Sequence, residues 1–390
     1  MSGRREYDIV IFGATGYTGR LIVNYLVKHG PKDVTWALAG RNMGSLKKVA
    51  SNHSIISGLL QGDTTDTASL DRICESCKIV LSVAGPYSIH GPPLVEACLR
   101  AGTHYMDLTG ELAYLRWIVD QHDTAVEKGV ALVSGCGFDS IPSDLGNLLI
   151  HDFAAENGES VEIVHSYYQM QGGDTPSGGT AASMGAGRAA MLSVDHNPLS
   201  INPYSHRTGV IAPTRRFMNY NSTLGCYAAP FLMATGNERI VRRSNCLNGY
   251  PMSSYGEQAM GGFFESIKHT IMWWAVAFAL SVYVVRVVLL RCMPAPGEGP
   301  TEAQKANDFF KATFLGSNSR LPGTKPRYSA TVAFKGNPYD ATAVLAVEAA
   351  VVLLRKSTVK GGALTPAACM GMDLVRSLRT KGFTMTVQKL

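Results

Sequence analysis

The feature of this sequence that most restricts its fold is a run of three glycines at fixed spacing near the start of the chain. The segment 13–19 follows a short apolar run at 8–12 and precedes a helical pattern over about 16–29. In parallel α/β folds the first glycine permits a tight turn, the second lets a diphosphate approach the backbone, and the third lets the helix pack closely. This order predicts a dinucleotide-binding site formed by Gly13, Ala14, Thr15, Gly16, Tyr17, Thr18 and Gly19. The alternative is a glycine turn that serves only the folding of the chain.

Apolar strands and helices alternate over the first 150 residues. The strands expected after the first one are 34–39, 59–61, 79–83, 104–107 and 130–133. Strands that are apolar throughout are typical of a parallel sheet that helices cover on both faces. Residues 1–150 are therefore predicted to form a Rossmann-like, doubly wound α/β domain.

The end of the second strand distinguishes NADP from NAD in such folds, because a base there accommodates the 2′-phosphate and an acid binds the ribose hydroxyls. This chain has Arg41 at that position. A guanidinium presents a planar fork of donors to a phosphate, so NADP is predicted and NAD is less favoured. An ordinary solvated arginine is the competing interpretation. Asp63, after the third strand, is placed to accept a hydrogen bond from the adenine amino group.

The fourth strand leads into a second candidate segment for cofactor binding. It ends in the small residues Ala84, Gly85 and Pro86, followed by Tyr87. Ligands of open α/β sheets bind at the carboxyl ends of the strands, so a nicotinamide or ribose would lie against these residues. The alternative is a turn that simply ends the strand.

The next two strands bring polar residues to the same edge of the predicted sheet. The fifth strand ends at Asp107 and leads to Thr109 and Glu111, and Asp139 follows the sixth. Tyr87 and Asp139 are the candidate catalytic residues, because a hydride transfer needs a group that gives or takes a proton. Ser143, directly before Asp144, is expected to cap a helix.

The length and composition fit a globular protein of two domains. The chain has 390 residues, of which 46% are hydrophobic and 17% charged, so it can form a large core. The net charge of +6 comes from scattered Lys and Arg, and no nucleic-acid partner is expected. The eight cysteines lack the spacing of a disulfide scaffold, and neither a metal site nor a signal peptide is expected.

Together these motifs resemble the saccharopine dehydrogenase-like oxidoreductase family, which is related to the bacterial trans-acting enoyl reductases. The resemblance rests on the segments 13–19, 39–41, 84–87 and 136–144. It continues in the same order through 176–180, 230–234, 241–244, 296–300 and 361–366, so it covers nearly the whole chain. It implies an NAD(P)-binding Rossmann domain followed by a substrate domain, with links to lipid droplets, mitochondria, membranes and glycolipid synthesis. It identifies no catalytic residue, because the basic residues that bind substrate in saccharopine-forming enzymes have no match here.

Beyond residue 150 the pattern changes to that of an α+β domain, predicted over 151–340 as the substrate domain. Strands are expected at 161–168 and 328–334, a helix at 180–192, and a loop over 195–227. Helices are predicted at 341–354 and 365–379. As the resemblance implies, residues 341–390 are expected to pack back on the first domain.

An apolar segment at 271–290 lies within the second domain. Its first fifteen residues carry no charge, Trp273 and Trp274 stand near one end, and Arg286 and Arg291 near the other. A bilayer span needs about 20 apolar residues, with aromatic and basic residues at its ends. Insertion into a membrane or lipid-droplet surface is favoured, a buried core helix or a homodimer interface comes second, and a full span is least favoured.

These features predict an NADP-dependent oxidoreductase that moves a hydride to or from a C=O, C=N or C=C group. The substrate is expected to be a small molecule or a lipid-linked group. The expected location is the cytosol-facing surface of a lipid droplet, mitochondrion or other membrane. The alternative is a catalytically silent, dinucleotide-binding scaffold or sensor at a lipid surface. The chain contains no Tyr-x-x-x-Lys, which argues against a short-chain dehydrogenase mechanism.

Overall fold

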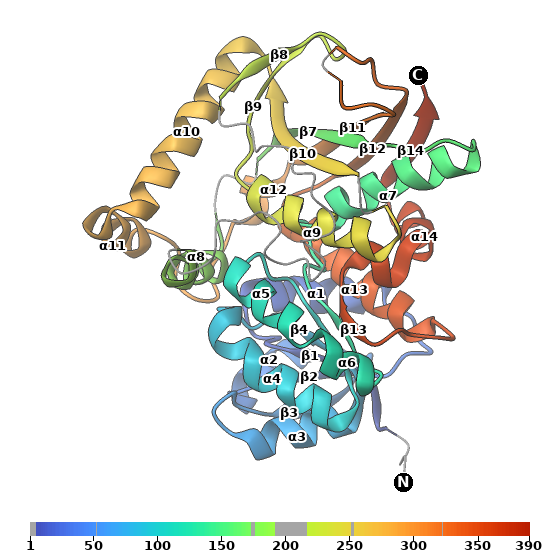
Figure 1. The fold of residues 1–390 in the computed structure, drawn as a ribbon. Helices are drawn as coiled ribbons and strands as arrows, with labels where there is room; N and C mark the ends of the chain where they lie inside the picture. The colour runs from blue at the N-terminus through green and yellow to red at the C-terminus, as the bar shows by residue number, and fades with distance from the viewer. Residues whose placement is uncertain (1–4, 52, 173–175, 192–216, 251–252, 322) are drawn as a thin grey trace.

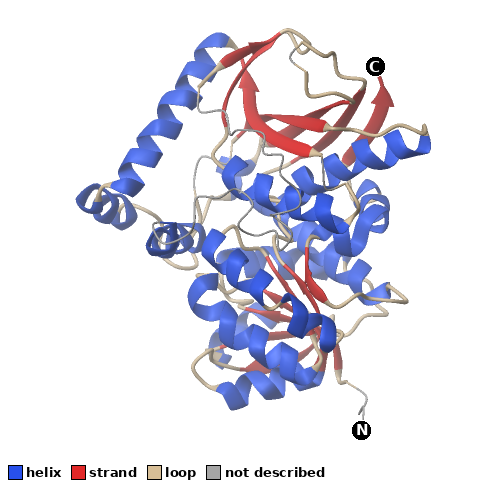
Figure 2. Ribbon diagram, in the orientation of Figure 1, coloured by secondary structure: helices blue, strands red, loops and turns tan. Residues whose placement is uncertain are grey.

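Two seven-stranded sheets lie at opposite ends of the molecule, and helices fill the space between them (Figure 1). The computed structural model describes residues 5–51, 53–172, 176–191, 217–250, 253–321 and 323–390. Figure 2 shows the same view by secondary structure, with helices on the first sheet, between the sheets, and along one side of the molecule.

The first sheet is parallel throughout. Its order is β13 (Gly362–Leu364), β6 (Ala131–Val133), β5 (His104–Asp107), β4 (Cys77–Ser82), β1 (Tyr7–Phe12), β2 (Trp36–Gly40) and β3 (Ile56–Gln61). The connecting helices are α1 (Tyr17–His29), α2 (Met43–Ala50), α3 (Thr67–Ser76), α4 (Tyr87–Ala101), α5 (Leu112–Asp120) and α6 (His122–Glu127). The central strands are apolar and buried along nearly their whole length, as a sheet covered on both faces requires. The predicted doubly wound α/β fold is confirmed.

One strand of this sheet comes from a distant part of the sequence. β13 pairs in parallel with β6, with Ala363 opposite Leu132. The sequence pattern predicts only helices between residues 341 and 390, and this prediction is wrong. A strand of three residues is too short for its apolar pattern to be recognised without its partner.

The second sheet is mixed. Its order is β14 (Thr384–Lys389), β12 (Tyr328–Lys335), β11 (Phe309–Ser317), β7 (Ile163–Gln171), β10 (Ser254–Gly261), β9 (Cys226–Pro230) and β8 (Asn219–Asn221). Among the strands that the structure describes in this sheet, only β7 and β10 pair in parallel. β7 and β12 match the predicted strands. The described part of the predicted loop 195–227 contains β8 and the start of β9, so that part of the prediction is wrong, and 195–216 lie outside the described residues.

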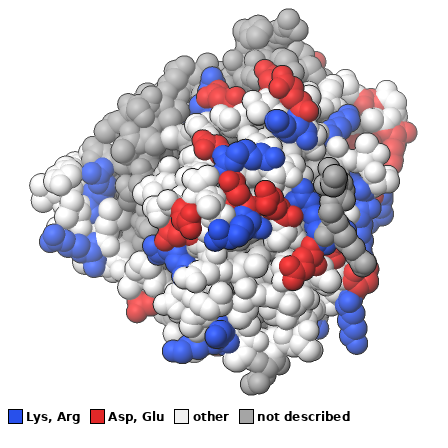
Figure 3. Space-filling model, turned by 90° about the horizontal axis from the view of Figure 1, so that it is seen from below, with Lys and Arg blue, Asp and Glu red and all other residues white. Residues whose placement is uncertain are grey.

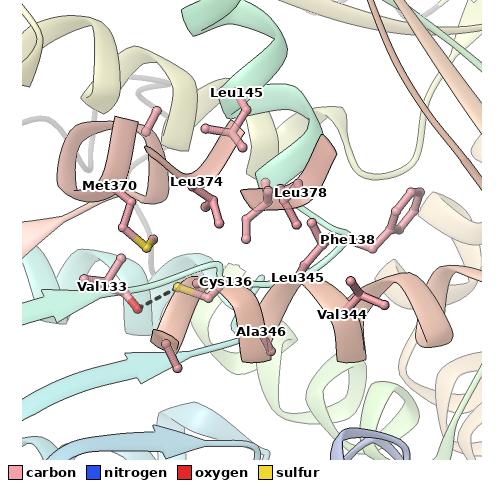
Figure 4. Close-up of a cluster of buried hydrophobic side chains, with 14 of the residues drawn as sticks. Val133, Cys136, Phe138, Leu145, Val344, Leu345, Ala346, Met370, Leu374 and Leu378 are labelled. Atoms are coloured by element: carbon pink, nitrogen blue, oxygen red, sulfur yellow. Dashed lines mark hydrogen bonds between the residues drawn. The ribbon is translucent and has the colours of Figure 1, made fainter. Parts of the chain in front are cut away.

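Four helices lie between the sheets and share one hydrophobic core with both. They are α7 (Ile141–Glu156), α9 (Ala234–Leu247), α13 (Pro338–Arg355) and α14 (Pro366–Arg379). Figure 4 shows part of this core, which includes Leu145 of α7, Leu345 of α13, Leu374 of α14 and Val133 of β6. All four side chains are fully buried, and each stabilises the fold by about 1.5–3 kcal/mol. The two sheets are therefore joined by packing as well as by the chain.

The predicted apolar segment forms two helices, α10 (Phe263–Ser281) and α11 (Tyr283–Arg291), which extend along one side of the molecule (Figure 1). We call them the apolar arm. No single helix in the described ranges is long and apolar enough to cross a membrane, although 263–279 and 283–291 would pass that test together and are bent by 107°. The interpretation as a buried core helix is wrong, because the arm exposes large apolar side chains: Phe263, Phe264, Ile271, Met272, Trp274, Phe278, Tyr283, Val284, Val285 and Val288.

Candidate functional site

The glycine turn begins where three strand ends meet. The Gly13 N–H donates to the Ala39 carbonyl of β2 at 2.9 Å, and the Val83 N–H after β4 donates to the Phe12 carbonyl of β1 at 2.8 Å. Gly13 has φ +93°, and a Cβ placed on it would lie 2.9 Å from the backbone nitrogen of Ala84. Both the left-handed conformation and the close approach of the neighbouring strand end require glycine here.

The turn leaves the amino-terminal end of α1 open to an anion. Gly16 is the N-cap residue, no side chain caps this helix, and its first turn contains no acidic residue. A Cβ on Gly19 would lie 2.6 Å from the Gly13 carbonyl oxygen, so α1 packs directly on the turn. The free N–H groups and the helix dipole suit a diphosphate. The segment from Gly13 to Gly19, with Ala14, Thr15, Tyr17 and Thr18, therefore fits a dinucleotide.

The end of β2 brings a second group of predicted residues together. Arg41 is exposed, and its carbonyl accepts a hydrogen bond from the Gln61 amide at 3.1 Å. Asp63 accepts from the N–H and hydroxyl of Thr65 at 3.0 and 2.9 Å, and these bonds, together with nearby Arg41 and His90, hold the pKa of Asp63 below its usual value. His90, which no sequence motif indicates, also lies here, and burial and the charge of Arg41 lower its pKa. A neutral imidazole and a guanidinium thus lie near one another where a 2′-phosphate would bind.

The segment after β4 lies against the glycine turn. Ala84 contacts the Gly13 position, and Gly85 and Pro86 lead into α4, whose N-cap residue is Pro86. The first two N–H groups of α4, those of Tyr87 and Ser88, donate to the Glu111 carboxylate at 2.8 and 2.9 Å. This helix end is therefore already occupied by an anion of the protein itself, in contrast to α1.

The acidic residues at the end of β5 and just after it point into the protein. Asp107 is fully buried and accepts from the N–H groups of Thr109 and Gly135 at 3.1 and 3.2 Å. Burial raises the pKa of Asp107 to about 7. Asp107 therefore joins the ends of β5 and β6, and Glu111 caps α4. A sequence cannot show which way such a side chain turns.

The two predicted catalytic residues lie in different surroundings. Tyr87 is buried, and desolvation, with the charges of Asp107, Glu111 and Asp139, raises its pKa well above the usual value. Asp139 is exposed, although protein surrounds its carboxyl group closely enough to raise its pKa to about 6. Its charge acts on both Tyr87 and Tyr168 of the second sheet, so Asp139 lies where the two domains meet.

A buried polar network that the sequence analysis missed begins near Asp139. Glu257 of β10 accepts hydrogen bonds from Ser143, Asn237 and Tyr255 at 2.8, 2.8 and 2.9 Å. The hydroxyls of Ser143 and Tyr168 are 2.6 Å apart. Ser143 therefore belongs to this network, and its expected role as a helix cap is wrong. Burial raises the pKa of Glu257 to about 7.

The described residues contain no group of three or more His, Cys, Asp or Glu side chains arranged to hold a metal ion. Figure 3 shows the face formed by the first sheet and its helices, where acidic and basic side chains are interspersed. Such a mixture produces little net field at a distance from this face.

Comparisons with known proteins agree with this geometry. Residues 9–133 match the model of the saccharopine dehydrogenase NADP binding domain. A putative trans-acting enoyl reductase of Mycobacterium tuberculosis is 32% identical, covering 99% of this chain and 98% of its own. The trans-acting enoyl reductase of Mycobacterium ulcerans is also 32% identical, covering 100% of this chain and 99% of its own.

A solved structure confirms the fold. The apo saccharopine dehydrogenase (L-Glu forming) of Saccharomyces cerevisiae matches with a TM-score of 0.56 over 98% of this chain and 100% of that one, at 14% identity. The matched NADP-binding domain contains the glycine turn, Arg41 and Asp63, so the predicted cofactor is confirmed as NADP. The chain belongs to the saccharopine dehydrogenase-like oxidoreductase family, is related to the trans-acting enoyl reductases, and binds NADP through its first domain.

Proposed function

We propose that this protein is an NADPH-dependent reductase of an enoyl group in a lipid-linked substrate, and that it works on the phospholipid surface of a membrane or lipid droplet. The observation that carries the proposal is the apolar arm, which exposes large apolar side chains on the same molecule as the NADP site. The curated relatives, which align over nearly their full length, are named as enoyl reductases, and this favours a C=C bond over C=O or C=N.

The arm has the chemistry of a lipid-binding surface. Phe278, Val284 and Val288 are 63%, 68% and 57% exposed, an arrangement that is costly in water and favourable in a lipid interface. Arg286 and Arg291 stand on α11, which carries no acidic residue. Basic residues beside exposed apolar ones favour an anionic phospholipid surface.

Reduction of an enoyl group needs a hydride and a proton. When bound, the reduced cofactor supplies the hydride. Asp139 is suited to hold the proton, because its side chain is exposed and its pKa of about 6 leaves part of the population protonated near neutral pH. The buried Tyr87 stays protonated, and its backbone N–H holds the Glu111 carboxylate in place.

The test uses the full-length protein with vesicles of phosphatidylcholine and phosphatidylserine that contain an acyl lipid with a trans-2 double bond. We expect NADPH to be consumed with the unsaturated lipid and not with its saturated counterpart. Val288→Glu should abolish both vesicle binding and turnover on vesicles. Val126→Glu is the matched control, because Val126 is 50% exposed on α6, away from the arm, and this variant should behave as the parent protein.

Three results would contradict parts of this proposal. If NADPH binds but no enoyl, keto or imine lipid is reduced, the catalytically silent scaffold is the better description. If Val288→Glu still sediments with vesicles, the arm is not the lipid-binding surface. If the parent protein ignores vesicles and sediments as a dimer that Val288→Glu dissociates, a second copy of the chain covers the arm.

A further inference from the structure

The segment that follows the apolar arm contacts the glycine turn. We call residues 292–300, between α11 and α12 (Glu302–Lys305), the strap. The Tyr17 hydroxyl donates to the Pro300 carbonyl at 2.7 Å. The Arg20 guanidinium donates to the Thr15 carbonyl of the turn at 2.7 Å and to the Gly297 carbonyl of the strap at 2.6 Å. One side chain thus bridges the turn and the strap.

The strap also fits closely against the ring of Tyr17. A Cβ on Gly299 would lie 2.7 Å from three atoms of that ring, so any larger residue would push the strap away from α1. Arg20, Tyr17 and part of the strap line a cavity of about 610 Å³. The strap therefore forms one wall of a space beside the diphosphate-binding end of α1.

The strap is linked to a second cofactor-binding segment through α8 (Gly178–Met191). The Gly178 N–H, at the start of α8, donates to the Glu298 carbonyl of the strap at 2.9 Å. A Cβ on Gly85 would lie 3.2 Å from the Ser183 hydroxyl of α8. Figure 1 shows α8 beside α11, between the arm and the first sheet. The strap and α8 together connect the arm to the two candidate cofactor-binding segments, 13–19 and 84–86.

Arg20 lies where a bound cofactor would affect the position of the strap. Its guanidinium makes no ion pair with any residue in the described ranges, and it lies within hydrogen-bond distance of the turn at the amino-terminal end of α1. A diphosphate at this end would supply the missing negative charge. Holding Arg20 in place would also hold the carbonyl of Gly297, because the same guanidinium bonds to both.

We infer that docking of the apolar arm on a lipid surface and binding of NADPH at the glycine turn strengthen one another through the strap. The inference rests on the proposed function, and it adds regulation of the NADP site by the lipid surface. A lipid surface that holds α11 in place also holds the start of the strap, which follows α11 directly. Less conformational entropy is then lost when the bound cofactor orders the rest of the strap. Linkage requires that the cofactor strengthen lipid binding by the same factor.

The coupling can be measured in both directions on the full-length protein. NADPH affinity is titrated by cofactor fluorescence with and without vesicles of phosphatidylcholine and phosphatidylserine. Vesicle affinity is measured by co-sedimentation with and without saturating NADPH. We expect the vesicles to lower the NADPH dissociation constant about tenfold, and NADPH to lower the vesicle dissociation constant by the same factor.

Two variants examine the strap itself. Gly299→Ala should leave both ligands bound but reduce the coupling to less than about twofold, because its Cβ separates the strap from Tyr17. Tyr17→Phe keeps the ring, removes the bond to Pro300, and is the second test if Gly299→Ala folds poorly. Its readout is the ratio of NADPH affinities with and without vesicles, which does not depend on the affinity of this variant for NADPH alone. Gly262→Ala is the matched control at the base of the arm, where a Cβ would lie 3.8 Å from its nearest neighbour, and it should keep the full coupling.

The outcomes separate this inference from the proposed function. If the protein binds vesicles and NADPH with unchanged affinities for each in the presence of the other, the coupling is refuted and the proposed function stands. If it binds NADPH but no vesicles, both the lipid surface and the coupling are refuted. If Gly299→Ala and Tyr17→Phe both keep the tenfold effect, the strap does not carry it.

Discussion

Replacing Gly13 with alanine would measure two costs that require glycine at the turn: backbone strain at positive φ and close contact with Ala84. An L residue at φ +93° costs about 1–2 kcal/mol in backbone strain. The new Cβ would also lie 2.9 Å from the Ala84 nitrogen and 3.0 Å from its Cβ, and such overpacking adds about 1–3 kcal/mol. Gly13→Ala should therefore lower the free energy of unfolding by about 2–5 kcal/mol.

Gly129 provides the matched control, because it has φ +64° and a Cβ there would find no atom within 4 Å. Gly129→Ala should lower the free energy of unfolding only by the cost of backbone strain, about 1–2 kcal/mol. Urea denaturation of both variants, with and without NADPH, measures the difference. NADPH should still stabilise Gly129→Ala and should no longer stabilise Gly13→Ala. Equal destabilisation of the two variants would refute the argument from the close approach of Ala84.

Three further predictions follow from the site. Arg41→Ala should weaken NADPH binding by about 2 kcal/mol, or roughly 30-fold, and NADH binding little, whereas equal losses in titrations of both cofactors would contradict the phosphate role of Arg41. The pKa of Glu257 is raised from 4.5 to about 7, so the folded state holds this proton more tightly than the unfolded chain. The contribution of Glu257 to the free energy of unfolding should therefore be complete below pH 4.5 and fall by about 3 kcal/mol as pH rises through 7, and Glu257→Gln should reduce the pH slope of the parent protein by that amount in denaturation curves. Asp139→Asn should remove a step near pH 6 from the pH profile of NADPH consumption, and an unchanged profile would exclude Asp139 as the proton donor.

The parts of the fold that the sequence predicted are those with local signals. The glycine turn, the apolar strands of the first sheet and the start of α14 at Pro366 each carry their pattern within a few residues. β10 could not be predicted in this way, because Glu257 and Gln258 are buried polar residues within a strand. Their cost of burial is offset by partners such as Asn237, which lies on another element.

The roles of residues in the candidate site could likewise be predicted only where they depend on local sequence. Arg41 and the glycine turn could be predicted because their roles depend on position along one strand or turn. The roles of Glu111 and Ser143 depend on which helix end or strand lies opposite each side chain. The bond between Tyr17 and Pro300 joins residues that are remote in sequence, and no pattern in either segment indicates the other.

The segment 362–389 contributes one strand to each sheet, and this affects how the protein is made on the ribosome. The cofactor-binding sheet lacks β13, and the second sheet lacks β14, until this segment has been translated. About 230 residues separate β6 from β13, which corresponds to roughly 10–50 s of synthesis. During that interval the outer edge of β6 is an unpaired strand that can pair with other chains. We therefore expect nascent chains to depend on chaperones until the carboxyl-terminal segment emerges, and the NADP-binding half expressed alone to aggregate.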